Sequence, residues 1–125
     1  MEYLWVGVGG FTGANARYVV GAIVGDRIGG AFPYGTFLVN FAGSLAIGIV
    51  LTLLTEVVIA DPVWRRLVVV GFLGGFTTFS TYTYEAIILI EDGAWGQALA
   101  YVLGSNLLGL AACGAGIVLV RAFER

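Results

Sequence analysis

The feature that most constrains the fold is the stretch Gly71–Glu85, GFLGGFTTFSTYTYE, which lies within a hydrophobic run long enough to cross a bilayer. Gly74 and Gly75 stand together in it, and seven of the eight residues from Thr77 to Tyr84 carry hydroxyl groups. Paired glycines weaken a helix, and irregular backbone at membrane depth persists only where protein or a water-filled cavity satisfies it. The stretch therefore predicts a transmembrane helix that is broken near its middle, with a polar feature beside the break.

The composition indicates a membrane protein. Of the 125 residues, 59% are hydrophobic and 11% are charged, whereas soluble domains carry roughly a quarter charged residues. A membrane-spanning helix needs about 20 apolar residues, so the chain has room for four such helices and no soluble module. We expect one all-α transmembrane domain over residues 1–125, with helices at about 4–24, 34–56, 63–90 and 95–120. Asp61-Pro62 is a typical helix start, with an N-cap aspartate and proline at the first helical position.

Small residues recur at every fourth position of the first helix. The set is Gly9, Gly13, Gly21 and Gly25, with Arg17 in the gap. Positions four apart share a helix face, and faces of small residues let membrane helices approach closely. The spacing predicts a packing face that carries one cation. Because arginine is costly in hydrocarbon, Arg17 is expected near an interface, in a vestibule or paired; an arginine that extends to the lipid headgroups is the alternative.

A polar row also follows one face of the second helix. It comprises Thr36, Asn40, Ser44, Gly48 and Thr52. Asn40 lies well inside the span, where its amide is either an interhelical hydrogen-bonding group or part of a permeation path; the spacing leaves both open. The fourth helix has a similar row, Tyr101, Ser105, Gly109 and Cys113, for which close packing is favoured at the last two positions.

The distribution of arginine favours one orientation. Arg65, Arg66, Arg121 and Arg125 fall on the same side as the N-terminus, and only Arg27 falls on the other. Because cytoplasmic loops are enriched in arginine and lysine, the N-terminus is expected in the cytoplasm.

The side chains indicate transport rather than catalysis. The chain has no histidine, a single cysteine and no phosphate-binding loop, so no enzymatic constellation is present. Glu85 shares a helix face with Thr81, and intramembrane ionisable residues are functional candidates. Four helices can hardly enclose a pore, so we expect a dimer. The alternatives are a proton-coupled small multidrug exporter and a non-conducting assembly subunit; the former needs a carboxylate inside the first helix, where only Glu2 stands at its start.

Three motifs resemble the CrcB/Fluc family of microbial fluoride channels. They are GFLGGFTTFSTY from Gly71, GTFLVNFAG at Gly35–Gly43 and GGFTGANARY at Gly9–Tyr18. The resemblance implies four-helix subunits in the inner (plasma) membrane that form an antiparallel, dual-topology dimer. It also implies two fluoride pathways, a structural sodium ion at the dimer centre, passive export of fluoride from the cytoplasm, and no role for nucleic acid.

The resemblance assigns roles to individual residues. The residues that it places on the fluoride pathway are Asn40, Phe79, Ser80, Thr81, Tyr82, Tyr101 and Ser105. It places Arg17, Thr36 and Glu85 near a vestibule, and the backbone carbonyls of Gly74 and Thr77 on the sodium ion. The chain departs from the family at Tyr82, where a second phenylalanine is usual, and at Gly109 and Cys113, which replace hydroxyl residues. The strong arginine bias leaves a heterodimer with an oppositely oriented homologue open beside the homodimer.

Overall fold

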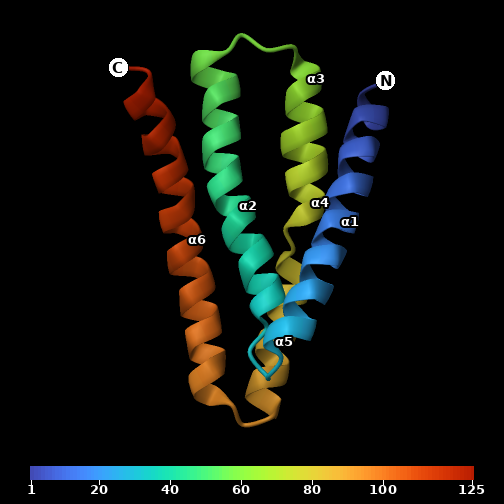
Figure 1. The fold of residues 1–125 in the computed structure, drawn as a ribbon, viewed down its shortest axis with the longest axis vertical. Coiled ribbons are helices and arrows are strands. Elements are labelled where there is room, and N and C mark those ends of the chain that lie inside the picture. The colour runs from blue at the N-terminus through green and yellow to red at the C-terminus, as the bar shows by residue number, and fades with distance from the viewer.

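The computed structural model describes residues 1–125 and shows an all-helical chain that runs up and down four times (Figure 1). The first segment is α1 (Glu2–Ile28), and the second is α2 (Tyr34–Thr52), continued by the π-helical η1 (Leu53–Val57). The third comprises α3 (Pro62–Trp64), the π-helical η2 (Arg65–Leu73), α4 (Gly74–Phe76) and α5 (Phe79–Glu91). The fourth is α6 (Trp95–Phe123). The predicted four-helix, all-α fold is confirmed.

Two of these segments are long and apolar enough to cross a membrane. They are Tyr34–Val57 and Trp95–Phe123. Both termini and the loop before α3 lie at one end of the molecule (Figure 1). Two ion pairs join neighbouring segments at this end: Glu2 with Arg66, and Glu56 with Arg121, each at 2.6 Å. Asp61 accepts a hydrogen bond from the Val63 N–H at 2.9 Å, which confirms the predicted start of the third segment.

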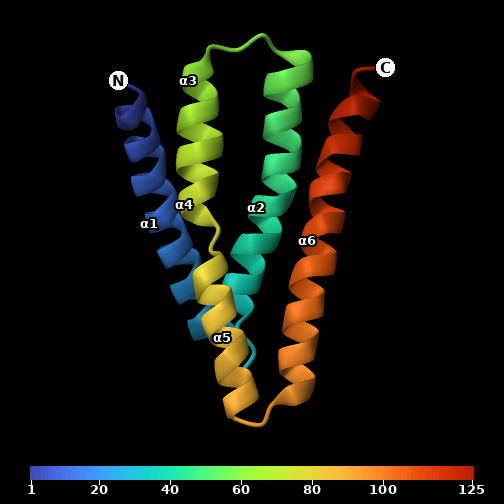
Figure 2. The same ribbon diagram turned by 180° about the vertical axis from the view of Figure 1, so that it is seen from behind.

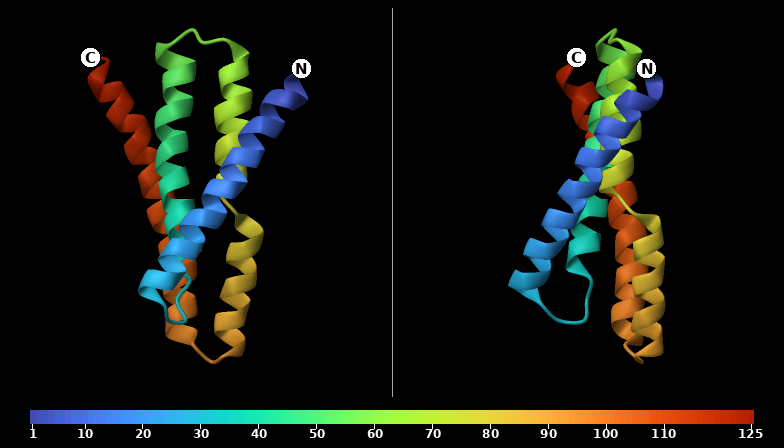
Figure 3. Two further views of the ribbon diagram at one scale, coloured as in Figure 1. Left: turned by 45° about the vertical axis from the view of Figure 1, so that its right-hand side comes forward. Right: turned by 90° about the vertical axis from the view of Figure 1, so that its right-hand side faces the viewer.

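The upper half of α1 packs on the third segment through its glycines. A Cβ atom on Gly9 would collide with the Leu67 carbonyl oxygen, and one on Gly13 would collide with the Phe72 carbonyl oxygen. Small residues therefore set the close approach, as predicted. The face continues against α2, because a Cβ atom on Gly35 would lie 3.1 Å from the Gly21 Cα atom. It ends before Gly25, where an added Cβ atom would meet nothing within 4 Å. Figure 3 shows that the lower half of α1 leans away from the α5–α6 hairpin.

α2 and α6 are held together in the same way. A Cβ atom on Gly48 would collide with the Cys113 carbonyl oxygen, and one on Gly116 would lie 2.7 Å from the Leu45 carbonyl oxygen. At Gly109 the added atom would lie 3.5 Å from the Ser44 hydroxyl oxygen. The close-packing interpretation is thus confirmed at Cys113, whereas Gly109 faces Ser44 at an ordinary contact distance.

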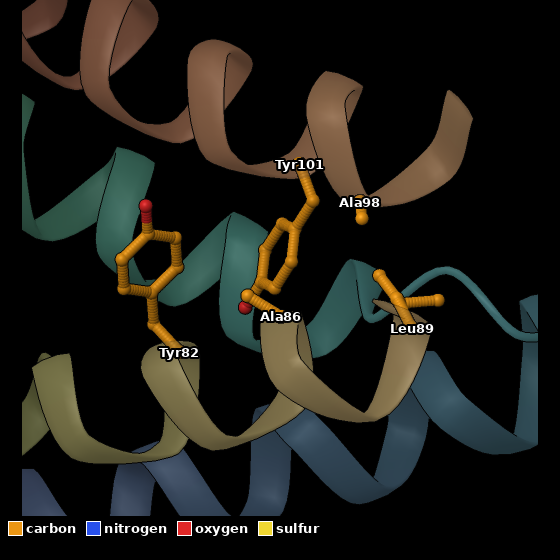
Figure 4. Close-up of a cluster of buried hydrophobic side chains, with 5 residues drawn as sticks. All are labelled: Tyr82, Ala86, Leu89, Ala98 and Tyr101. Atoms are coloured by element: carbon orange, nitrogen blue, oxygen red, sulfur yellow. The ribbon is translucent and has the colours of Figure 1, made fainter. Parts of the chain in front are cut away.

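The lower end of the molecule has its own core between α5 and α6 (Figure 4). Its buried residues are Tyr82, Ala86, Leu89, Ala98 and Tyr101. The rings of Tyr82 and Tyr101 meet edge to face, with centroids 5.2 Å apart and planes at 72°. This arrangement is a favourable one for an aromatic pair, and it fixes α5 on α6 directly below the point where the third segment changes direction.

Candidate functional site

The third segment is not one continuous helix. α4 ends at Phe76, Thr77 (φ −88°, ψ 157°) and Thr78 (φ −149°, ψ 119°) are extended, and α5 begins at Phe79 (Figure 2). The Thr78 hydroxyl accepts the Thr81 N–H at 3.2 Å, as the N-cap of α5. We call residues 77 and 78 the interruption.

The paired glycines do not themselves form the interruption. Gly74 has helical backbone angles (φ −63°, ψ −37°). A Cβ atom on Gly75 would lie 2.8 Å from the Gly10 carbonyl oxygen, so this glycine allows α1 to pack closely. The expectation that the paired glycines cause the break was therefore wrong. The extended residues are the two threonines that follow.

Asn40 holds the interruption from the neighbouring helix α2. Its Nδ2 donates to the Thr78 carbonyl oxygen at 3.0 Å, and its Oδ1 accepts the Thr78 N–H at 2.8 Å. One amide therefore satisfies both backbone polar groups of an extended residue, which hydrocarbon could not do. Of the two interpretations of Asn40, the structure shows the interhelical hydrogen bond.

Two carbonyl oxygens at the interruption lose their helical partners. Because the Thr78 N–H is bonded to Asn40, it does not reach the carbonyl oxygen of Gly74, four residues earlier. The carbonyl oxygen of Thr77 accepts no hydrogen bond. Hard cations take oxygen ligands, so these two oxygens suit an ion such as sodium. The chain has no group of three or more histidine, cysteine, aspartate or glutamate side chains that could hold a metal ion.

A surface cavity of about 710 Å³ opens beside the interruption, between α1, α2 and α5. The polar residues along it include Arg17, Thr36, Thr78, Thr81 and Glu85. The structure thus brings all three predicted vestibule residues together on one cavity. Arg17 forms neither of the two ion pairs of the structure.

Glu85 joins three helical segments. Its Oε1 accepts the Thr36 hydroxyl at 2.8 Å, and its Oε2 accepts the Tyr101 hydroxyl at 2.7 Å. The carboxylate therefore fixes α2, α5 and α6 around the lower part of the cavity, and it holds the fully buried ring of Tyr101 in place.

The aromatic residues after the interruption point in different directions. The Phe79 ring is 77% exposed on the single subunit, whereas Tyr82 is 8% exposed and lies in the α5–α6 core. The ring centroids are 5.6 Å apart. The exposed Ser80 hydroxyl lies 3.5 Å from that of Thr78. On α6 the Ser105 hydroxyl oxygen is buried and has no hydrogen-bond partner.

Comparison with known proteins gives the family. Residues 4–117 match the family described as CrcB-like protein, Camphor Resistance (CrcB). The chain belongs to this CrcB-like family. Proteins named fluoride-specific ion channel FluC from Solibacter usitatus and Koribacter versatilis are each 47% identical to it over 121 residues. These alignments cover 97% and 96% of this chain and 99% and 95% of the relatives. A protein of the same name from Chloroflexus aurantiacus is 46% identical over 121 residues, covering 96% of this chain and 95% of that protein. The resemblance inferred from three motifs is confirmed, and this CrcB-like chain is a membrane protein.

One residue of the site, Asn106, was not identified from the sequence. Asn106 of α6 donates from Nδ2 to the Tyr82 hydroxyl at 2.9 Å and to the Val102 carbonyl oxygen at 2.8 Å. Its position could have drawn attention, because an amide within an apolar helix needs a partner. Asn106 is not one of the positions four apart that include Tyr101 and Ser105, so residue spacing did not identify it.

Proposed function

We propose that this chain is the subunit of a passive, fluoride-selective ion channel that exports fluoride from the cytoplasm. The observation that carries the proposal is the interruption at Thr77 and Thr78, with its backbone satisfied by Asn40 and its Thr77 carbonyl free. It occurs in a chain that matches proteins named as fluoride channels along nearly its whole length. Such a polar break within an apolar bundle is the kind of backbone that membrane proteins retain where it lines a cavity.

All four helical segments are proposed to cross the inner (plasma) membrane. α1 has 27 residues and the third segment joins the same two ends as its neighbours (Figure 1). The arginines of η2 and of the C-terminal end of α6 lie at the end that holds both termini, and Arg27 lies at the other. The positive-inside rule therefore favours termini in the cytoplasm.

The channel is proposed to be an antiparallel dimer with two fluoride pathways. A single subunit leaves Phe79 exposed and the Thr77 carbonyl oxygen without a donor, so the interruption is incomplete by itself. A partner of opposite orientation would bring a second interruption against the first. The Gly74 and Thr77 carbonyls of both subunits would then hold a central sodium ion, which supplies positive potential near the anions. A homodimer is proposed; the arginine asymmetry also fits a heterodimer with an oppositely oriented homologue.

Each pathway is proposed to begin at the cavity and to continue along α5 and α6. The unpaired cation of Arg17 attracts anions to the vestibule that it shares with Thr36 and Glu85. The positive edge of the Phe79 ring faces the ion. Hydrogen-bond donors replace its water, and the residues proposed to supply them are Asn40, Ser80, Thr81, Tyr82 and Ser105. Tyr101 is proposed to line the pathway with its ring, because its hydroxyl proton is donated to Glu85. The bilayer and the fluoride ion are the other partners.

Reconstitution of the purified chain alone tests this function. Liposomes loaded with potassium fluoride should release fluoride to an electrode rapidly once valinomycin lets potassium follow, and only slowly without it. Liposomes loaded with chloride should retain their anion. Intact dimers that release no fluoride would refute the proposal. Proton-driven uptake of a cationic dye by those dimers would point to an exporter instead.

A further inference from the structure

The hydroxyl group of Tyr82 accepts a hydrogen bond but donates none within the chain. Asn106 Nδ2 lies 2.9 Å from the Tyr82 hydroxyl and 2.8 Å from the Val102 carbonyl oxygen. A carbonyl oxygen only accepts, so it must face the amide nitrogen, and this contact fixes which end of the Asn106 amide points toward Tyr82. An amide nitrogen only donates. The tyrosine oxygen therefore accepts from Asn106, and its own O–H proton, which bonds to no other group of the chain, stays available.

The surroundings of this hydroxyl suit a small anion. Figure 4 shows the Tyr82 ring rising from α5 toward α6, beside Tyr101, whose ring points the opposite way. The Phe79 ring also lies against Tyr82, with centroids 5.6 Å apart. The Ser105 hydroxyl, next to Asn106 in sequence, is buried and has no partner. Two hydroxyl groups with unused hydrogen-bonding capacity thus belong to the same pair of helices.

Asn106 itself indicates that this face does not meet lipid. The residue lies well inside α6, one of the two segments apolar enough to span a membrane, and it is exposed on the single subunit. Its Oδ1 accepts no hydrogen bond within the chain. An amide oxygen left unpaired in hydrocarbon is costly, so protein or a polar path must cover it in the membrane.

We propose that the Tyr82 hydroxyl donates a hydrogen bond to the permeating fluoride ion, and that Asn106 is the positioning residue that fixes its direction. This inference rests on the proposed function and adds a donor that a phenylalanine at position 82 would lack. Asn106 acts through Tyr82. Its amide donates to the tyrosine oxygen, so the tyrosine O–H is directed away from Asn106 and can donate to the anion. No bond is made or broken in this step, and the proton stays on the tyrosine.

The test compares the fluoride concentration that half-saturates channel current in the wild type and in variants. Tyr82→Phe should raise this concentration about tenfold, because a hydrogen bond to a charged group is lost. The variant should fold, since the ring remains and Asn106 keeps its bond to Val102. Tyr84→Phe is the matched control: Tyr84 is 69% exposed, its hydroxyl has no partner, and its removal should change nothing.

The positioning role of Asn106 is tested by a double-mutant cycle. Asn106→Leu should raise the half-saturating concentration about threefold when Tyr82 is present and should have no effect in the Tyr82→Phe background. Asn106→Ser, whose hydroxyl can still serve the Val102 carbonyl, provides a second variant should leucine impair folding. Equal effects of the Asn106 variants in both backgrounds would overturn the positioning role. If the wild type conducts fluoride and Tyr82→Phe has the same half-saturating fluoride concentration, the donor role is refuted but the proposed channel function is not. A wild type without fluoride current would refute both.

Discussion

Replacing Asn40 with leucine removes the one side chain that satisfies the interruption. Both hydrogen bonds between Asn40 and the Thr78 backbone are lost, while a side chain of similar size still fills the space. The structure predicts that the interruption becomes the weakest part of the fold. Helix α5 is then free to shift against α4, and fluoride flux should fall with stability.

The magnitude follows from the two groups left unpaired. A buried backbone donor or acceptor without a partner costs about 1–3 kcal/mol. Thr78 lies on the cavity of about 710 Å³, where water can partly replace the amide, so the lower part of this range applies to each group. We expect Asn40→Leu to reduce the free energy of unfolding by about 2–3 kcal/mol.

Denaturant unfolding in mixed micelles measures this loss, with fluoride efflux as the functional readout. Ser44→Ala is the matched control one turn further along α2. The Ser44 hydroxyl bonds only the Asn40 carbonyl of its own helix at 2.7 Å, so its removal should cost less than about 0.5 kcal/mol. Asn40→Asp keeps the acceptor, loses the donor and adds a negative charge beside the proposed path; flux should fall here too. Equal stabilities of Asn40→Leu, Ser44→Ala and wild type would refute the reasoning.

Three further predictions follow from the packing and the polar contacts. Gly13→Ala should destabilise the protein by about 1–3 kcal/mol, because its Cβ would collide with backbone, whereas Gly7→Ala, with nothing within 4 Å, should be neutral or slightly stabilising in the same unfolding assay. Glu85→Gln should cost about 1–3 kcal/mol, because one of its two hydroxyl donors must then face an NH₂ group; an unchanged unfolding midpoint would contradict that role. Arg121→Met should leave the unfolding midpoint almost unchanged, because the arginine and its partner Glu56 are 57% and 44% exposed, and a clear fall in the midpoint would show that the pair holds α2 on α6.

The four helices could be predicted because their signals are local. Apolar runs of sufficient length, the Asp61-Pro62 start and the four-residue spacing of Gly9 and Gly13 all depend on neighbouring residues in the chain. The predicted limits fall within a few residues of the observed ones. The π-helical turns of η1 and η2 carried no such local signal.

The contacts within the site depend on residues far apart in the sequence. Asn40 and Thr78 are 38 positions apart, so the spacing within α2 marked Asn40 as polar without naming its partner. The same holds for Asn106 with Tyr82, where the hydrogen bond depends on how α5 leans on α6. The resemblance supplied the vestibule residues, and the structure then brought Arg17 and Glu85 to one cavity.

The most direct test of the central claim is the backbone conformation of Thr77 and Thr78 in bilayers. Solid-state NMR of the reconstituted protein, labelled at threonine, reads it from the Cα and Cβ chemical shifts. The account predicts extended values for both residues in the wild type, and altered values in Asn40→Leu. Helical shifts at both Thr77 and Thr78 in the wild type would contradict it.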